Sequence, residues 1–74
     1  MKYKIGDSFY LDGQKAISNE WLFIFSILKP NFIIHEAKYL CICKRDIASN
    51  GTFNDIFYSI MDDETLENFG YKLQ

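Results

Sequence analysis

The stretch WLFIFSIL, residues 21–28, decides how this 74-residue chain is interpreted, because it is apolar on both faces. Side chains along a strand alternate between the two faces of a sheet. This alternation gives two sets: Trp21, Phe23, Phe25 and Ile27 on one face, and Leu22, Ile24, Ser26 and Leu28 on the other. A small sheet usually buries one face and leaves the other in water. The chain therefore has to curl its sheet into a barrel or pair with something else.

Length and composition predict one folded domain over residues 1–74. Hydrophobic residues make up 49% of the chain and aromatic residues 18%. Each aromatic ring can bury roughly 150–250 Å², so the chain can form a core despite its size. Aromatic and β-branched residues also favour strands over helices.

The charge is small and unevenly distributed. The net charge is −2, and residues 47–74 hold one Lys against five Asp and Glu. A mildly acidic chain is not expected to bind nucleic acid, because the affinity of such binding comes mainly from the neutralisation of phosphates. The acidic last third of the chain is instead expected to contact a basic surface on a protein partner.

The N-terminus reaches Asp7 before any apolar run begins, which is unlike a signal peptide. We therefore expect a cytoplasmic protein that does not enter a membrane. Cys41 and Cys43 are expected to be reduced thiols, since a disulfide two residues apart in a strand would be strained.

The runs and turns along the chain predict strands at its two ends and through its middle. Loosely alternating residues 3–11 are interrupted at Gly6-Asp7, and a turn is expected at residues 12–13. The strand 21–28 ends at Lys29-Pro30-Asn31, because Pro cannot donate to a strand ladder. We expect another strand over 38–45, and we leave residues 32–36 open between loop, strand and one helical turn.

The last third predicts a hairpin, a strand and a short helix. Ser49-Asn50-Gly51 is a hairpin signal, and residues 53–61 alternate as a strand. Residues 62–70 predict one or two helical turns, with Asp62 or Asp63 as the N-cap and Gly70 as a left-handed terminator. Residues 71–73 are expected to close the sheet as an edge strand.

Two short motifs resemble those of SH3-like and KOW-like small barrels. KIGDSFYL, residues 4–11, resembles their first strand, and IMDDETL, residues 60–66, resembles the segment that closes many of them. The resemblance implies an all-β, SH3-like small barrel of about five strands with one short helical turn near 63–69. Members of this group bind proteins, peptides or nucleic acids, so the fold does not fix the function.

Catalysis and cofactor binding are not expected. His35 and Glu36 with the two cysteines lack the spacing of a zinc site. Thiols within an apolar strand are inert because burial raises their pKa. We predict no enzyme, no metal site and no cofactor.

Two sets of residues are predicted to contact a protein partner. The acidic set is Asp62, Asp63, Glu64 and Glu67, which could instead be favourable charge at a helix N-terminus. The apolar set is Trp21, Leu22 and Ile24. Six rings are expected in the core first and on a recognition surface second: Trp21, Phe23, Phe25, Phe32, Phe57 and Tyr58. The face of Leu22, Ile24 and Leu28 then needs cover from residues 12–20, from residues 32–37 or from a second chain in a homo-oligomer.

The sequence leads to one function hypothesis and one alternative. The short chain, rich in Lys, Asn, Ile and Phe, resembles small accessory proteins of phages and mobile elements. That resemblance implies a non-enzymatic inhibitor that binds a protein of a host defence system. The alternative is a nucleic-acid-binding module that uses Lys38, Lys44, Arg45 and Tyr39.

Overall fold

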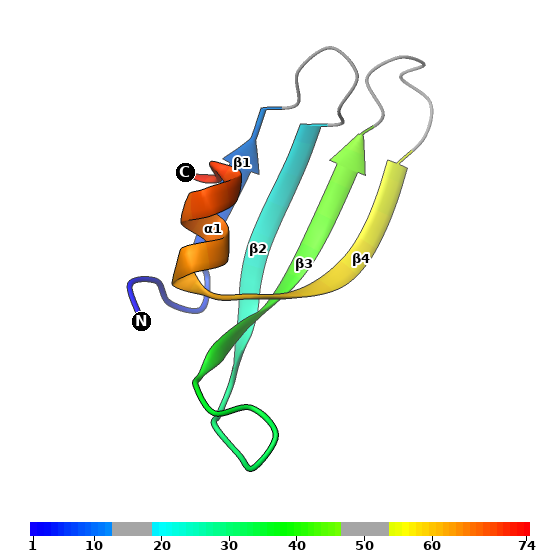
Figure 1. Ribbon diagram of the computed structural model, residues 1–74. Helices are drawn as coiled ribbons and strands as arrows, with labels where there is room; N and C mark the ends of the chain where they lie inside the picture. The colour runs from blue at the N-terminus through cyan, green and yellow to red at the C-terminus, as the bar shows by residue number, and fades with distance from the viewer. Residues whose placement is uncertain (13–18, 47–53) are drawn as a thin grey trace.

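The computed structural model describes residues 1–12, 19–46 and 54–74. In chain order the elements are β1 (Ser8–Leu11), β2 (Asn19–Leu28), β3 (Lys38–Asp46), β4 (Asn54–Met61), α1 (Asp63–Phe69) and β5 (Lys72–Leu73). The strands form one five-stranded antiparallel sheet in the order β4-β3-β2-β1-β5 (Figure 1). The prediction of an all-β chain with one short helix near residues 63–69 is confirmed.

The predicted strands have close counterparts in the structure. β2 begins at Asn19, two residues before the predicted strand, and β3 continues to Asp46. β4 and β5 lie within the predicted ranges 53–61 and 71–73. The turns predicted at residues 12–13 and 49–51 involve positions outside the described residues.

The first predicted strand is shortened at its start by Gly6. This residue has φ 99°, in the left-handed region that favours glycine, so the strand cannot run through it. Its N–H still donates to the carbonyl of Ile24 at 2.9 Å, and the N–H of Ile24 donates to the carbonyl of Asp7 at 3.0 Å. The interruption predicted at Gly6-Asp7 is therefore confirmed, and the regular strand starts at Ser8.

Residues 32–36, left open by the sequence, form an irregular loop between β2 and β3. The Asn31 side-chain oxygen accepts hydrogen bonds from the N–H groups of Ile33 and Ile34 at 2.7 and 2.8 Å. Such a side chain satisfies the backbone locally and replaces a helix or strand ladder. The loop extends away from the sheet beyond the end of β2 and the start of β3 (Figure 1).

Helix α1 begins and ends as its sequence predicts. The Asp62 side chain accepts a hydrogen bond from the N–H of Thr65 at 2.8 Å, which satisfies one of the free donors of the first turn. At the other end Gly70 has φ 81° and its N–H donates to the carbonyl of Glu67. Leu66 is the buried residue of the helix.

The core lies between α1 and one face of the sheet, which we call the inner face (Figure 1). Its buried members come from every strand except β5, and from α1: Phe9, Leu22, Ile24, Tyr39, Cys41, Cys43, Met61 and Leu66. Tyr3, from the segment before β1, packs against them edge-on to Phe9 with ring centroids 4.8 Å apart. A seven-residue helix and the N-terminal segment thus provide the cover that residues 12–20, residues 32–37 or a second chain were expected to give.

A bulge in β2 changes which side chains reach this core. The pairing with β3 shifts between Ile24 and Ser26, leaving Phe25 as the extra residue. Beyond it Ile27 lies opposite the buried Tyr39 and packs against the core. The strict alternation predicted over residues 21–28 is therefore wrong after Ile24, because one inserted residue reverses the faces.

No helix in the three described ranges has the length and apolar character needed to cross a membrane.

Candidate functional site

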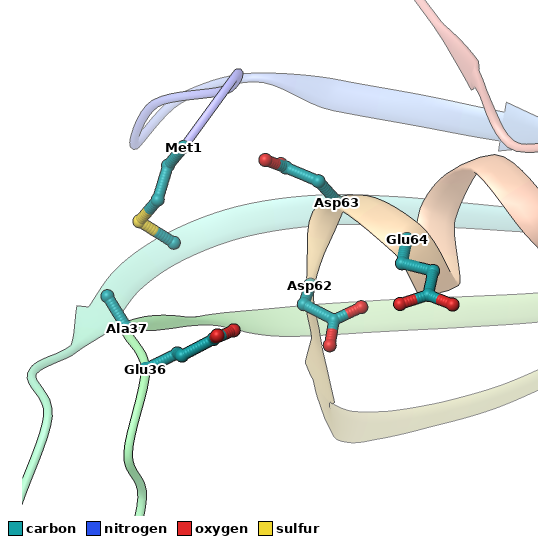
Figure 2. A pocket seen from close by; sticks show the side chains of 6 residues that line it. All are labelled: Met1, Glu36, Ala37, Asp62, Asp63 and Glu64. Atoms are coloured by element: carbon teal, nitrogen blue, oxygen red, sulfur yellow. The ribbon is translucent and has the colours of Figure 1, made fainter.

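The acidic residues predicted to meet a partner lie around the start of α1. A hollow of about 350 Å³ is lined there by Met1, Glu36, Ala37, Asp62, Asp63 and Glu64. Figure 2 shows that these side chains come from the N-terminal segment, from the loop before β3 and from the first turn of α1. The geometry brings three of the four predicted acids together, and adds Glu36.

Asp62 is occupied by contacts within the chain. Besides capping α1, its carboxylate accepts a hydrogen bond from Lys38 Nζ at 2.8 Å. This bond, followed by those from Thr65, holds the pKa of Asp62 well below its usual range. Asp62 therefore joins the start of α1 to the start of β3.

Asp63 links three segments of the protein. It accepts a hydrogen bond from the hydroxyl of the buried Tyr39, and two longer ones from the N–H of Lys2 at 3.2 and 3.3 Å. The same hydroxyl accepts the N–H of Tyr3 at 3.1 Å. Burial, reinforced by the bond to Asp63, raises the pKa of Tyr39 to about 12. Asp63 therefore holds the N-terminal segment and the helix over the core.

Glu67 pairs with Lys2 at the protein surface. Its hydrogen bond and charge raise the pKa of the Lys2 ammonium. Three of the four predicted acids thus contact groups of the same chain, which favours the interpretation of this cluster as helix-terminal charge. Glu64 is exposed on the outside of the first turn.

The opposite face of the sheet, which we call the outer face, presents large apolar side chains across three strands. The antiparallel register places Trp21 beside Lys44 and Ile56 in one row. The next row holds Phe23, Ile42 and Tyr58. Further along β4, Ile60 follows on the same face. We call this surface the outer patch, and it consists of Trp21, Phe23, Ile42, Ile56, Tyr58 and Ile60.

Most of the outer patch is in contact with solvent. The exposed fractions are 38% for Trp21, 44% for Phe23, 72% for Ile56, 72% for Tyr58 and 55% for Ile60. Taking about 180 Å² for each large side chain, these five leave roughly 500 Å² of apolar surface uncovered. Monomeric proteins rarely expose contiguous apolar patches larger than a few hundred Å². The outer patch is therefore the strongest candidate for a binding surface.

The rings of the outer patch are held in place by their neighbours. Trp21 packs at a tilt on Tyr10 with centroids 5.3 Å apart, and Lys44 Nζ lies 5.5 Å from the Trp21 ring centroid. Phe25, the bulge residue, packs on Tyr58 with centroids 5.6 Å apart. A hollow of about 200 Å³ beside Trp21 and Phe23 makes this part of the surface concave. A partner side chain would thus meet a preorganised apolar recess next to one ammonium group.

Two of the three apolar residues predicted to touch a partner lie elsewhere. Leu22 and Ile24 are 1% and 0% exposed and belong to the core under α1, so their face is not available to another molecule. Trp21 lies on the outer patch. The prediction placed the covered face on the wrong side of β2, because the sequence did not show that α1 packs across it.

The residues proposed for nucleic acid are not assembled into a basic surface. Lys38 pairs with Asp62, and Arg45 pairs with Glu20 at 2.9 Å. Tyr39 is fully buried and cannot stack on a base. Lys44 is exposed on the outer face, whereas Arg45 lies on the inner face above the Phe57 ring at 4.9 Å. The four side chains therefore belong to different parts of the molecule.

Neither thiol lies in an environment that would make it reactive. Cys41 and Cys43 are free and buried, and burial raises their pKa values to about 12 and about 11. His35 lies exposed in the loop before β3. Among the described residues no group of three or more His, Cys, Asp and Glu is placed to hold a metal ion.

A third hollow, of about 370 Å³, lies on the inner face beside the end of α1. Apolar side chains from β1, β4 and α1 line it, with the polar pair Glu20 and Arg45. Glu20 also accepts a hydrogen bond from the Tyr71 hydroxyl, and burial together with this bond raises the pKa of Tyr71. The polar groups at this end of the core therefore satisfy one another.

The sequence reasoning considered Tyr58 for a recognition surface only as the second choice after the core, and it did not select Ile56 and Ile60. Their signal was present in residues 53–61, where large apolar residues occupy both alternating sets. Comparison of the chain with protein-family models, with curated proteins and with solved structures finds no match.

Proposed function

We propose that this protein is a non-enzymatic binding module that holds another protein against its outer patch. The observation that carries the proposal is the exposure of five large apolar side chains on one face of a sheet whose other face packs against α1. Clusters of exposed aromatic residues are typical of the energetic centres of protein interfaces. The partner would present an apolar side chain to the recess beside Trp21 and an acidic or carbonyl group to Lys44.

The acidic cluster contributes less to this proposal than its sequence suggested. Asp62 and Asp63 hold α1 and the N-terminal segment in place, so changing them would disturb the fold as well as any interface. Glu64 is exposed and makes the cleaner test of the acidic end.

Affinity capture with matched variants tests the proposal. Phe23→Lys places a charge in the middle of the outer patch and should abolish capture of a partner that the wild type retains. Glu64→Lys changes the charge at the acidic end and should capture the same partner. Capture lost with Glu64→Lys and kept with Phe23→Lys would overturn the proposal and return the interface to the acidic cluster. Far-UV circular dichroism of both variants checks that the sheet is intact.

The biological role that we propose is inhibition of a bacterial defence protein, and it rests on the compositional resemblance to small phage proteins. Production of the protein in a bacterium that carries the targeted defence system should restore phage plating by orders of magnitude. The Phe23→Lys variant should not restore it. Unchanged plating across a panel of defence systems would refute this role while leaving the binding surface to be tested by capture.

A further inference from the structure

The free edge of β4 is the second feature of the molecule that lacks a partner within the described residues. β4 is the last strand on its side of the sheet and has eight residues. Natural edge strands are usually short, charged, bulged or interrupted by Pro, because a bare edge can pair with another chain. The opposite edge follows this rule, since β5 has two residues and one is Lys72. Residues 56–61 of β4 carry no charge and no Pro.

The ladder shows which backbone groups of β4 point outward. Ile24 exchanges its hydrogen bonds with residues 6 and 7, on the β1 side of β2. Successive residues of an antiparallel strand alternate in direction, so Phe23 faces β3 and bonds with its partner Ile42. Ile42 therefore faces β2, and Tyr58, its partner on β4, directs its N–H and C=O to the free edge. The same alternation directs those of Ile56 and Ile60 outward.

The side chains of this edge are symmetric about Tyr58. Ile56 and Ile60 stand two residues before and after it, on the same face. An antiparallel pair of two β4 strands with its two-fold axis at Tyr58 places Tyr58 opposite Tyr58, and Ile56 opposite Ile60. Asp55 then faces Met61 of the second copy, so no like charges meet. In the pairs Ile56–Ile60, Tyr58–Tyr58 and Ile60–Ile56 the backbone groups of each residue are directed at the other copy, which gives about six inter-chain hydrogen bonds.

We propose that two copies of this protein pair through β4 into one continuous sheet, with the two-fold axis at Tyr58. The contact is isologous and closes on itself. The short, charged β5 edge prevents the same sheet from growing further. The outer patches of the two copies lie side by side on one face, and they meet at Ile56, Tyr58 and Ile60 of β4. Trp21 and Phe23 lie on the interior strand β2 and remain available to the protein partner proposed above.

The size of the edge contact sets its expected strength. An eight-residue edge is about 26 Å long, and the contact consists of this one backbone edge and its flanking side chains. Such a contact is smaller than a standard stable interface, which buries ~800 Å² per partner. We therefore expect a monomer–dimer equilibrium with a dissociation constant in the micromolar range.

Sedimentation velocity of the full chain from about 1 to 200 µM tests the proposal. The wild type should shift from monomer to dimer across this range. Tyr58→Lys places two ammonium groups opposite each other on the two-fold axis, so it should weaken the dimer at least tenfold. Phe23→Lys adds the same charge to the outer patch on the interior strand β2 and should leave the equilibrium unchanged. A wild type that stays monomeric throughout, or a dimer lost with Phe23→Lys and kept with Tyr58→Lys, would overturn the proposal.

A cysteine experiment reads the register directly. Tyr58→Cys brings two thiols about 5.5 Å apart between Cα atoms, within the range of a disulfide, and should form a covalent dimer on mild oxidation. In the Ile56→Cys variant each new thiol lies opposite Ile60 of the second copy and not opposite the other new thiol, so little covalent dimer should form. The native thiols are buried and provide a low background. Equal crosslinking of the two variants would rule out the two-fold axis at Tyr58. Phe23→Lys should lose the protein partner and keep the dimer, because Phe23 lies on the interior strand β2 and away from the β4 edge. Failure of the dimer and failure of the proposed function are therefore distinguishable.

Discussion

The inner and outer faces of this sheet are made from alternate residues of the same strands, yet the inner face is buried and the outer face is exposed to solvent. On β2, Leu22 is 1% exposed and Phe23, its neighbour, is 44% exposed. Both are large and apolar, so hydrophobicity alone does not decide which face becomes the core. The deciding element is α1, which contributes Leu66 to one face and joins it to the N-terminal segment through Asp63. The difference teaches that a short helix can determine the burial of a whole sheet.

The largest expected effect comes from comparing those two neighbours. Leu22→Ala removes a packed side chain and leaves a cavity under α1, and it should lower the free energy of unfolding by about 3 kcal/mol. Phe23→Ala removes a side chain that is already half in water and should lower it by less than ~1 kcal/mol. Urea unfolding followed by circular dichroism measures both. Equal losses would show that the outer face is also part of the core.

A second, smaller effect tests how the inner face is closed. Tyr39→Phe removes the hydroxyl that donates to Asp63 and accepts from Tyr3, and it should lower the free energy of unfolding by about 2 kcal/mol. Tyr58→Phe on the outer patch is the matched control and should change it by less than ~0.5 kcal/mol.

The contribution of the Tyr39 hydroxyl should also depend on pH. Its pKa is raised from 10.0 to about 12 in the folded protein, so folding favours the protonated hydroxyl. This contribution is therefore complete below pH 10 and decreases as the pH rises toward 12. The stability difference between wild type and Tyr39→Phe should shrink over that window. A difference that stays constant between pH 9 and pH 12 would contradict the assigned role of the hydroxyl.

The smallest effect concerns the end of the covering helix. Gly70 has φ 81°, and a Cβ there would meet only Leu11 Cδ1 at 4.0 Å, so the cost of Gly70→Ala is in the backbone. It should lower the free energy of unfolding by about 1 kcal/mol, or the melting temperature by roughly 4–8 °C. Asn68→Ala, on the exposed side of the same helix, should be neutral or slightly stabilising. An unchanged melting temperature for Gly70→Ala would mean that the end of α1 is free to rearrange.

Much of the fold could be predicted from the sequence because its signals are local. Pro30 ends a strand, Gly6 interrupts one, and Asp62 and Gly70 begin and end the helix through contacts with near neighbours. The faces could not be assigned, because that depends on where α1 lies relative to residues 40 positions earlier. The bulge at Phe25 was also hidden, since nothing in residues 21–28 marks an extra residue.

The candidate site was harder to predict than the fold for the same reason. Three of the four selected acids lie together around the start of α1, but the contacts of the acids with Lys2, Lys38 and Tyr39 involve distant parts of the chain. Trp21 was selected with Leu22 and Ile24 because the three are adjacent in sequence. In a strand, adjacency places neighbours on opposite faces, so a contiguous segment is a poor description of a surface.

The bulge at Phe25 has a consequence for recognising distant relatives of this protein. Before it, the buried positions of β2 are the even-numbered Leu22 and Ile24, and after it the odd-numbered Ile27 packs against the core. A related sequence that lacks the extra residue would keep the same core with its hydrophobic pattern shifted by one position beyond Ile24. An alignment without a gap at Phe25 would then match buried residues to exposed ones along the rest of the strand. A search that allows one insertion at this point should therefore detect relatives that an ungapped pattern misses.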